Sequence, residues 1–339
     1  SASPQASILG ATASTLLEID EAQDVLISKF DKDLSPMTAS THACRALWGT
    51  NWTSTTLLAR EKRAALAAQA RDGRRRVWEL NADEVGAEVP AYKAFVTEQI
   101  AKLGRDHPFV RTQLFSEEID AEGGMFPPSR RAAMQGTHSC QNAPLPGHIY
   151  ALTIDVAGED EGASIDPTRL DNPRRDSTAV TLYDVDTSTV TDPTIRRPRY
   201  FVAQRYEWLG VKHTSLYGQI RTIVDAWSSR YLAIDATGVG AGLTSFLTAA
   251  YPDKVIPFVF NTSSKSKLGW DFLAVCDTGR FQDYSPSVVH YEVQRSNAVD
   301  HPLTRFQRQL EACKYEVMPG PGQVLKWGVP DSARDPSTG

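Results

Sequence analysis

The chain has 339 residues, with 36 Lys and Arg against 41 Asp and Glu, which gives a net charge of −5. Its 41% hydrophobic and 23% charged residues exclude a disordered or fibrous chain. The acidic balance gives no general attraction to nucleic acid, so a DNA-binding surface has to be a local patch. No apolar run approaches the roughly 18 residues of a membrane helix. The four cysteines form no CxxC pair, which argues against a zinc ribbon or a disulfide framework.

The first part of the chain predicts strands and helices in alternation. Residues 15–21 are typical of a strand, and residues 60–70 predict a helix that Gly73 ends. Apolar residues at helical spacing predict another helix over residues 89–103. Residues 104–148 are rich in Gly and Pro and predict a connecting segment. Because the sequence opens on Ser and ends on DPSTG, a turn composition, we expect it to be a fragment of a longer protein.

From residue 148 onward the pattern predicts an α/β domain. The expected order is three strands, a helix, a strand, a helix, a strand and a helix. The strands are expected at residues 149–156, 178–185, 199–208, 231–235 and 254–260, and the helices at residues 216–227, 243–247 and 265–276. Three strands in an antiparallel meander, followed by strands that are joined through helices, predict a mixed sheet with helices on its faces. That order is the order of the ribonuclease H-like fold.

Two aspartates follow apolar strands of this predicted sheet. Asp155 ends the first strand and Asp235 ends the fourth, and these strands are neighbours in a ribonuclease H-like sheet. An acid after an apolar strand is also a common turn or helix-cap residue. Two such acids side by side favour a shared Mg²⁺ or Mn²⁺, and a pair of ions hydrolyses phosphodiesters. Asp176, at the start of the second strand, is a further candidate ligand of a metal ion or its water.

The glycine run at residues 238–243, GVGAGL, does not match the dinucleotide-binding pattern. The pattern G-x-G-x-x-G requires Gly where Leu243 stands. We therefore expect these glycines to permit a tight turn between a strand and a helix, with amides that can approach a phosphate backbone.

Residues 16–22, LLEIDEA, have the form of a Walker B element. In such an element Asp20 would hold Mg²⁺ through water, and Glu21 would polarise the water that attacks ATP. The phosphate-binding loop G-x-x-x-x-G-K-[ST] does not occur in the sequence. We therefore expect the sequence by itself not to hydrolyse ATP well.

Three stretches together resemble the large terminase subunit of tailed bacteriophages. They are LLEIDEAQD at residues 16–24, LWGTNWT at residues 47–53, and the pair formed by Asp155 and the DATGVG segment at residues 235–240. The second stretch is similar to the coupling motif of that family, and Thr50 is the residue that matches it. The resemblance implies an ATPase that drives viral DNA into a capsid and a fused endonuclease that cuts concatemeric DNA.

The resemblance also implies a domain plan and a set of site residues. Residues 1–85 would be a partial packaging ATPase domain of the P-loop type, residues 86–147 a linker or subdomain, and residues 148–339 the nuclease domain. The nuclease acids would be Asp155 and Asp235, with Asp176 as an additional metal ligand. Glu21 would be the catalytic carboxylate of the ATPase, and Asp20 and Thr50 would act at the nucleotide. We expect the third nuclease acid of the family beyond Gly339, although Asp331 and Asp335 are candidates.

Cofactors, partners and location follow from the same resemblance. The nuclease would use Mg²⁺ or Mn²⁺, and the full-length protein would use ATP with Mg²⁺. The partners would be double-stranded DNA, the portal protein, the small terminase subunit and, in a ring, further copies of the full-length protein, with no membrane. The protein would act in the host cytoplasm and transiently at the procapsid portal.

Alternatives to a terminase remain open at this point. A transposase or resolvase on the same fold leaves the Walker B-like strand and Thr50 unexplained. A non-catalytic module that binds DNA or portal is another possibility. An actin-like ATPase is disfavoured because residues 155–159, DVAGE, lack a phosphate-binding Gly-Thr turn. The densest basic clusters lie at residues 71–76 and 196–199, with residues 174–175 near the candidate acids; each can contact phosphates or be a solvated surface run.

Overall fold

The computed structural model describes residues 11–119, 124–159, 176–193, 195–285, 301–318 and 323–330. The chain divides into two compact units. The first contains Ser1–Gly123 with Tyr315–Lys326, and the second contains Gly124–Lys314 with Trp327–Gly339. These two units are defined by contacts between residues and not by function. The predicted division into residues 1–85, 86–147 and 148–339 therefore stays a prediction.

The first unit contains a pair of parallel strands, β1 (Leu16–Ile19) and β2 (Cys44–Leu47), in a register that runs from Leu16 opposite Cys44 to Ile19 opposite Leu47. Helix α2 (Leu57–Asp72) starts at Thr56, whose hydroxyl accepts the Ala59 N–H at 3.2 Å, and ends at Gly73. The predicted strand and helix are therefore present. The two parallel strands and α2 form a small α/β arrangement, and its assignment to a packaging ATPase domain stays a prediction. Their core consists of Leu17, Ile19, Ala22, Val25, Phe30, Leu34 and Leu57.

Short helices complete the first unit. The small helix α1 (Ile27–Lys29) runs on into further helical turns up to Thr38. The helix predicted over residues 89–103 is α4 (Pro90–Leu103), and α3 (Ala82–Glu88) precedes it with a capping box of Asn81 and Glu84. A second core joins α3, α4 and the helical segment Val110–Leu114 through Ala82, Val96, Val110 and Leu114. The expected connecting segment is thus partly helical, because Val110 and Leu114 have a core to pack against.

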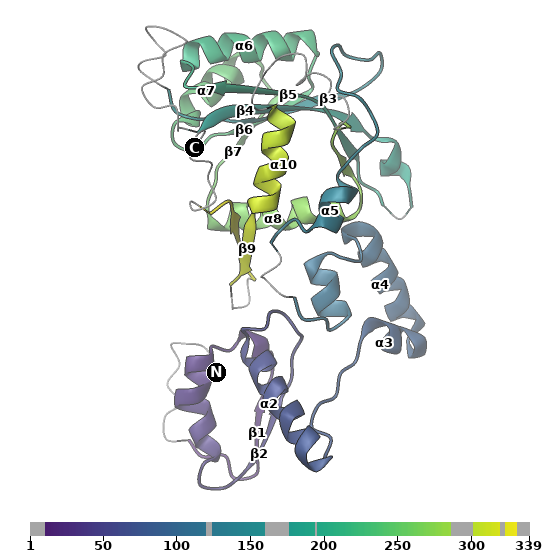
Figure 1. Cartoon of the computed structure of the whole chain (residues 1–339), viewed down its shortest axis with the longest axis vertical. Helices are drawn as coiled ribbons and strands as arrows, with labels where there is room; N and C mark the ends of the chain where they lie inside the picture. Colours follow the sequence, from purple (N-terminus) through teal and green to yellow (C-terminus); the bar gives the residue numbers. More distant parts are fainter. Residues whose placement is uncertain are drawn as a thin grey trace. The chain divides into compact units, whose positions relative to one another are not determined.

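The second unit is built on a six-stranded mixed sheet with the order β7-β6-β3-β4-β5-β8 (Figure 1). Strands β3, β4 and β5 form an antiparallel meander, while β6 lies parallel to β3 and β7 lies parallel to β6. This order confirms the ribonuclease H-like prediction. The strands are β3 (Tyr150–Asp155), β4 (Ser177–Asp186), β5 (Arg199–Leu209), β6 (Tyr231–Asp235), β7 (Val255–Phe258) and β8 (Phe281–Gln282).

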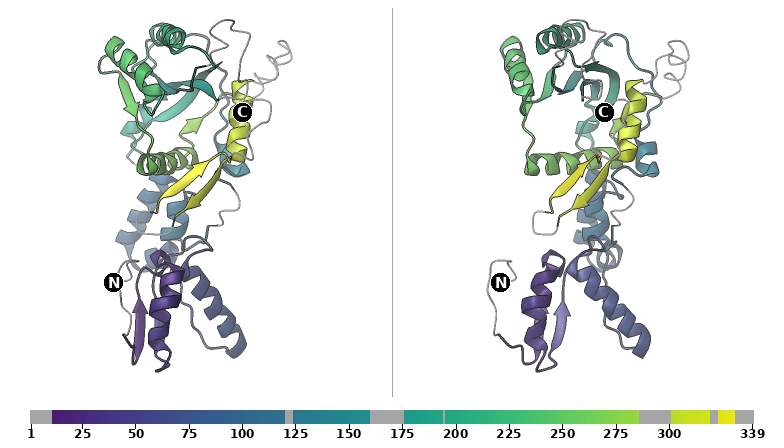
Figure 2. Two further views of the ribbon diagram at one scale, coloured as in Figure 1. Left: turned by 90° about the vertical axis from the view of Figure 1, so that its left-hand side faces the viewer. Right: turned by 60° about the vertical axis from the view of Figure 1, so that its left-hand side comes forward.

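Helices cover both faces of this sheet (Figures 1 and 2). Helices α6 (His213–Ala226) and α7 (Gly240–Ala250) bury Leu216, Ile220, Leu243 and Leu247 against one face. Helix α10 (Pro302–Ala312) lies on the other face, where the Arg205 guanidinium stacks 4.3 Å from the centre of the Phe306 ring. The sequence-based prediction missed α10. Further elements within the described residues include α5 (Pro128–Ala133), α8 (Thr262–Asp277), and a two-stranded sheet of β9 (Lys314–Val317) and β10 (Leu325–Gly328).

Candidate functional site

The sheet brings Asp155 and Asp235 to the same edge and the same face. Ile154 is opposite Ile234 in the parallel pair of β3 and β6, and each aspartate is the next residue of its strand. Because successive side chains of a strand alternate between faces, the two aspartates point away from the face where Ile154 and Ile234 are buried. They therefore lie on the face opposite α6 and α7, at the carboxyl ends of two neighbouring strands.

The three candidate acids interact electrostatically. Burial raises the pKa of the Asp155 carboxyl, and the nearby carboxylates of Asp235 and Asp176 raise it further. Asp176 directly precedes β4, the strand that pairs with β3 on its other side. Negative charges that disfavour one another in this way favour a cation between them. The chemistry of this group fits a hard divalent ion.

Few side chains that can bind a metal ion lie together within the described ranges. There, His, Cys, Asp and Glu side chains form no group of three or more that is ready to hold a metal ion. Mg²⁺ commonly takes one or two carboxylates and completes its shell with water and substrate phosphate oxygens. Asp155 and Asp235 can provide those carboxylates, with Asp176 close to them. The two further candidates for a third acid, Asp331 and Asp335, lie outside the described residues.

The loop after β6 is held against the strand end. An Oδ1 atom of Asp235 accepts the Thr237 N–H at 2.7 Å, and the Thr237 hydroxyl accepts the Phe260 N–H at 2.8 Å. Gly238 has a φ of +56°, and a Cβ on Gly240 would lie 2.1 Å from the Asp235 carbonyl oxygen. The expectation of a tight turn from strand to helix is confirmed, because the start of α7 packs directly on the Asp235 backbone.

The loop after β3 has its own set of hydrogen bonds. The Ala157 N–H donates to the Thr178 hydroxyl at 3.0 Å, which ties the loop to β4. The Ala157 carbonyl lies 3.0 Å from Nε2 of His213, and the His213 N–H donates to the Glu159 carboxylate at 2.7 Å. These contacts fix the chain directly after Asp155. The sequence-based prediction assigned no role to Thr178, Glu159 or His213.

That prediction also missed charged residues on the sheet face that carries Asp155. Ala179 of β4 is opposite both Asp155 and Glu207, so one cross-strand row contains Asp155, Ala179 and Glu207. Glu207 forms an ion pair with Arg305 of α10. The alternation in residues 205–208, Arg-Tyr-Glu-Trp, is the signal that would have indicated a charged face on β5.

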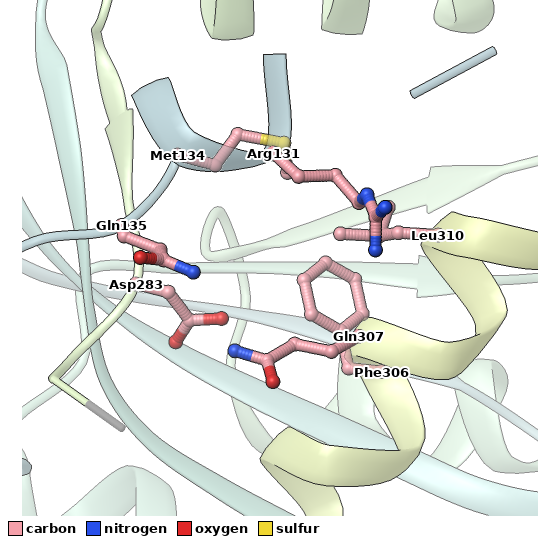
Figure 3. Close-up of a pocket in the computed structure, with 7 residues that line it drawn as sticks. All are labelled: Arg131, Met134, Gln135, Asp283, Phe306, Gln307 and Leu310. Carbon is pink, nitrogen blue, oxygen red and sulfur yellow. The ribbon is translucent and has the colours of Figure 1, made fainter. Parts of the chain in front are cut away.

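A small pocket lies under α10, on the same side of the sheet (Figure 3). Its polar lining includes Asp283, whose Oδ1 accepts from Arg205 at 2.5 Å, and the guanidinium of Arg131. The remaining lining residues are Met134, Gln135, Phe306, Gln307 and Leu310. None of the candidate acids lines this pocket, so it is separate from the carboxylate site.

The candidate ATPase residues follow the two parallel strands of the first unit. Asp20 and Glu21 come directly after β1, and Thr50 lies three residues after β2. The Ala22 N–H donates to the Trp48 carbonyl at 2.9 Å, so the two loops stay side by side beyond the strands. Asp20 is exposed, and its Oδ1 accepts the Glu21 N–H at 3.0 Å. The structure thus places Asp20, Glu21 and Thr50 on adjoining loops.

The basic clusters are partly neutralised. Arg76 forms an ion pair with Asp72 at 2.6 Å, and the Arg75 guanidinium lies 5.4 Å from the centre of the Trp78 ring. This favours the interpretation of residues 71–76 as a solvated surface run. Residues 174–175 lie outside the described ranges.

Within those ranges, every helix is too short or too polar to span a bilayer.

Comparison with known proteins gives a curated relative and several similar folds. No protein-family model matches the chain. A segment of 77 residues is 27% identical to a probable terminase ATPase subunit of Haemophilus phage HP1; it covers 23% of this chain and 13% of that protein. The chain therefore matches only a small part of the length of its curated relative. This match supports the resemblance to the large terminase subunit that the motifs indicate.

Two solved structures illustrate the similar folds. The large terminase of a thermophilic bacteriophage, in complex with ATP-γ-S, is 10% identical, covers 94% of this chain and 67% of its own, and has a TM-score of 0.47. The large terminase nuclease of the thermophilic phage G20c, with bound magnesium, is 13% identical, covers 60% of this chain and 87% of its own, and has a TM-score of 0.40. Since both TM-scores are below 0.5, the fold assignment rests on the sheet topology described above.

Proposed function

We propose that the chain is a segment of a phage DNA-packaging terminase, with a metal-dependent endonuclease in its second unit and part of the packaging ATPase in its first. The observation that carries the nuclease proposal is the placement of Asp155 and Asp235 at adjacent positions of β3 and β6, on one face of a ribonuclease H-like sheet. The substrate in this proposal is concatemeric double-stranded DNA.

In the nuclease proposal, the protein positions two carboxylates and holds the loops around them. Asp155 and Asp235 hold one or two Mg²⁺ or Mn²⁺ ions, and Asp176 binds a metal ion or its water. Such ions, when bound, supply a water of lowered pKa and stabilise charge on the phosphate. Thr178, through the Ala157 N–H, and Thr237, through its contacts to Asp235 and Phe260, keep the acids in place.

The test of the nuclease is cleavage of double-stranded DNA, in Mg²⁺ and in Mn²⁺, by the full-length protein of which this chain is proposed to be a segment. Asp155→Asn and Asp235→Asn should each lower the cleavage rate by at least about a thousandfold, because each removes a ligand of the ions that carry the reaction. Asp253→Asn is the matched control, since Asp253 is an exposed residue of the turn before β7, which begins beside the start of β6, at the opposite end of that strand from Asp235. Unchanged cleavage by either site variant would refute the assignment.

For the first unit we propose the roles of a packaging ATPase. Asp20 holds the Mg²⁺ of ATP, Glu21 orients the attacking water, and Thr50 links hydrolysis to movement. The printed sequence has no P-loop, so this activity belongs to a longer protein that supplies one. ATP hydrolysis by that protein, and its loss in Glu21→Gln, is the corresponding test. The portal protein, the small terminase subunit, a homo-oligomeric ring and a site of action at the procapsid portal in the host cytoplasm are parts of the same proposal.

A second candidate function is a transposase or resolvase, which the ribonuclease H-like topology also accommodates. Strand transfer to a second DNA without any ATP requirement would favour it. A non-catalytic assembly module is the remaining alternative. DNA binding without metal and without cleavage would favour that one.

A further inference from the structure

A buried side-chain amide joins the two loops that carry the candidate ATPase residues. Gln23 is only 3% exposed. Its Nε2 donates to Oε2 of Glu21 at 2.5 Å, and its Oε1 accepts the Thr50 N–H at 3.1 Å. Both ends of one amide group are therefore used, one on the loop after β1 and one on the loop after β2.

The packing around this amide leaves no room for an additional atom. A Cβ on Gly49 would lie 2.0 Å from Oε1 of Gln23 and 3.2 Å from the Ala22 nitrogen. A side chain at position 49 would therefore displace the Gln23 amide from the position in which it accepts the Thr50 N–H. Gly49 of the coupling-like motif thus leaves space for Oε1 of Gln23, which accepts the Thr50 N–H.

The chain of hydrogen bonds continues from Thr50 into the second core of the unit. The Thr50 hydroxyl donates to Oε1 of Gln113 at 3.3 Å. Gln113 belongs to the helical segment Val110–Leu114, whose apolar residues pack with α3 and α4 and not with the β1 and β2 core. The bonds from Glu21 through Gln23 and Thr50 to Gln113 therefore cross from one hydrophobic core to the other.

Each end of this chain of bonds has an unusual feature. Glu21 has a φ of +50°, a left-handed conformation that is costly for a residue other than glycine and that its neighbours have to maintain. At the other end, the buried Nε2 of Gln113 has no hydrogen-bond acceptor within the described residues. A strained residue at one end and an unused donor at the other allow an alternative hydrogen-bonded arrangement.

We propose that Gln23 is a positioning residue that transmits the state of the Glu21 carboxylate to Thr50 and Gln113. The proposal deepens the proposed ATPase function, on which its role in hydrolysis rests. When Glu21 engages a nucleotide or a water, its bond to Gln23 is lost, and the amide that holds Thr50 is free to turn. The link between the loops is a property of this chain and can be tested without ATP.

The first test measures the amide resonance of Thr50 in the full chain by NMR. Glu21→Ala removes the acceptor of the Gln23 Nε2 hydrogen bond; it should shift that resonance in the wild-type background and leave it unmoved in a Gln23→Met background, because Met fills the same space without the two hydrogen bonds. Gln69→Met, a change of the same chemistry on α2, is the matched control and should preserve the response. An equal shift with and without Gln23 would overturn the proposal.

A second measurement covers the case in which Gln23→Met does not fold. In the otherwise unchanged chain, Glu21→Ala should also shift the side-chain NH₂ resonances of Gln113. If those resonances do not move, the relay does not reach the second core and the proposal is wrong.

The third test is the steady-state ATPase rate of the longer protein that supplies the P-loop. Gln23→Met should lower kcat about tenfold, the effect of roughly one lost hydrogen bond in the transition state, with little change in KM for ATP. An inactive wild-type protein would refute the proposed function and leave the NMR result standing. An active wild-type protein with the same kcat in Gln23→Met would refute the role of Gln23.

Discussion

Asp155 of β3 and Asp235 of β6 occupy equivalent positions in two parallel strands, each directly after a residue of the pair formed by Ile154 and Ile234. The buried isoleucines fix which face each aspartate occupies, since a slip of one residue in either strand would turn its aspartate into the core. The hydrophobic core of the second unit therefore determines the register that brings the two carboxylates together.

The raised pKa of Asp155 predicts how the metal-free protein responds to pH. A carboxyl whose pKa is raised by folding favours the folded state while it is protonated, and this contribution is lost as the pH rises through the raised pKa. In EDTA, Asp155→Asn should therefore be more stable than wild type at pH 7 by a few degrees in Tm. The difference should shrink as the pH falls through the raised pKa and should be gone below the ordinary range of Asp.

Thermal unfolding in EDTA at a series of pH values measures this difference. Asp253→Asn provides the control and should follow the wild-type curve throughout. An Asp155→Asn protein that is less stable than wild type at pH 7 would show that Asp155 makes favourable contacts without metal.

The start of α7 predicts a contrast between two glycines of one helix. Gly240→Ala places a Cβ 2.1 Å from the Asp235 carbonyl oxygen, whereas a Cβ on Gly242 meets nothing within 4 Å. Overpacking of this kind costs about 1–3 kcal/mol, while Gly242→Ala should be neutral or stabilising by up to about 1 kcal/mol in a helix. Urea unfolding of the two variants measures the contrast, and equal stabilities would contradict the packing described for the end of β6.

The ion pair between Arg205 and Asp283 predicts a large loss of stability when one partner is removed. Both side chains are nearly inaccessible, at 7% and 6% exposed. Asp283→Asn leaves the Arg205 charge buried without its partner and should cost about 3–5 kcal/mol. Lys267 and Asp271 form an exposed pair on α8, so Asp271→Asn should cost at most about 1 kcal/mol. Urea unfolding of both variants measures these losses, and similar values would mean that Arg205 finds another partner or reaches water.

Strand patterns allowed much of the second unit to be predicted. The alternation in β3, β4 and β5 and the short apolar strand β6 were sufficient for the order of the five predicted strands and for the prediction that Asp155 and Asp235 follow neighbouring strands. The edge strand β8 was not predicted. The predicted site residues themselves remain predictions, because position in a sheet does not establish catalysis. The resemblance to terminases had to come from motif order, since no single motif is specific.

Other features could not be predicted because they depend on packing between distant segments. Helix α10 is an exception, since Leu303, Phe306 and Leu310 have the spacing of an amphipathic helix and the prediction overlooked this signal. The Glu207 and Arg305 pair joins residues 98 positions apart. The hydrogen bonds of Gln23 and the space at Gly49 depend on the distance between the loops after β1 and β2. That distance cannot be derived from the sequence.

The shared binding of divalent ions by Asp155 and Asp235 is the central claim, and calorimetric titration of the full chain with Mn²⁺ tests it most directly. Wild type should bind, and Asp155→Asn and Asp235→Asn should each weaken binding at least about tenfold, which is about 1.4 kcal/mol. Because both acids serve the same ions, the double variant should lose much less than the sum of the two single losses. Losses that add fully, or single variants that bind as well as wild type, would show that the two carboxylates do not form one site.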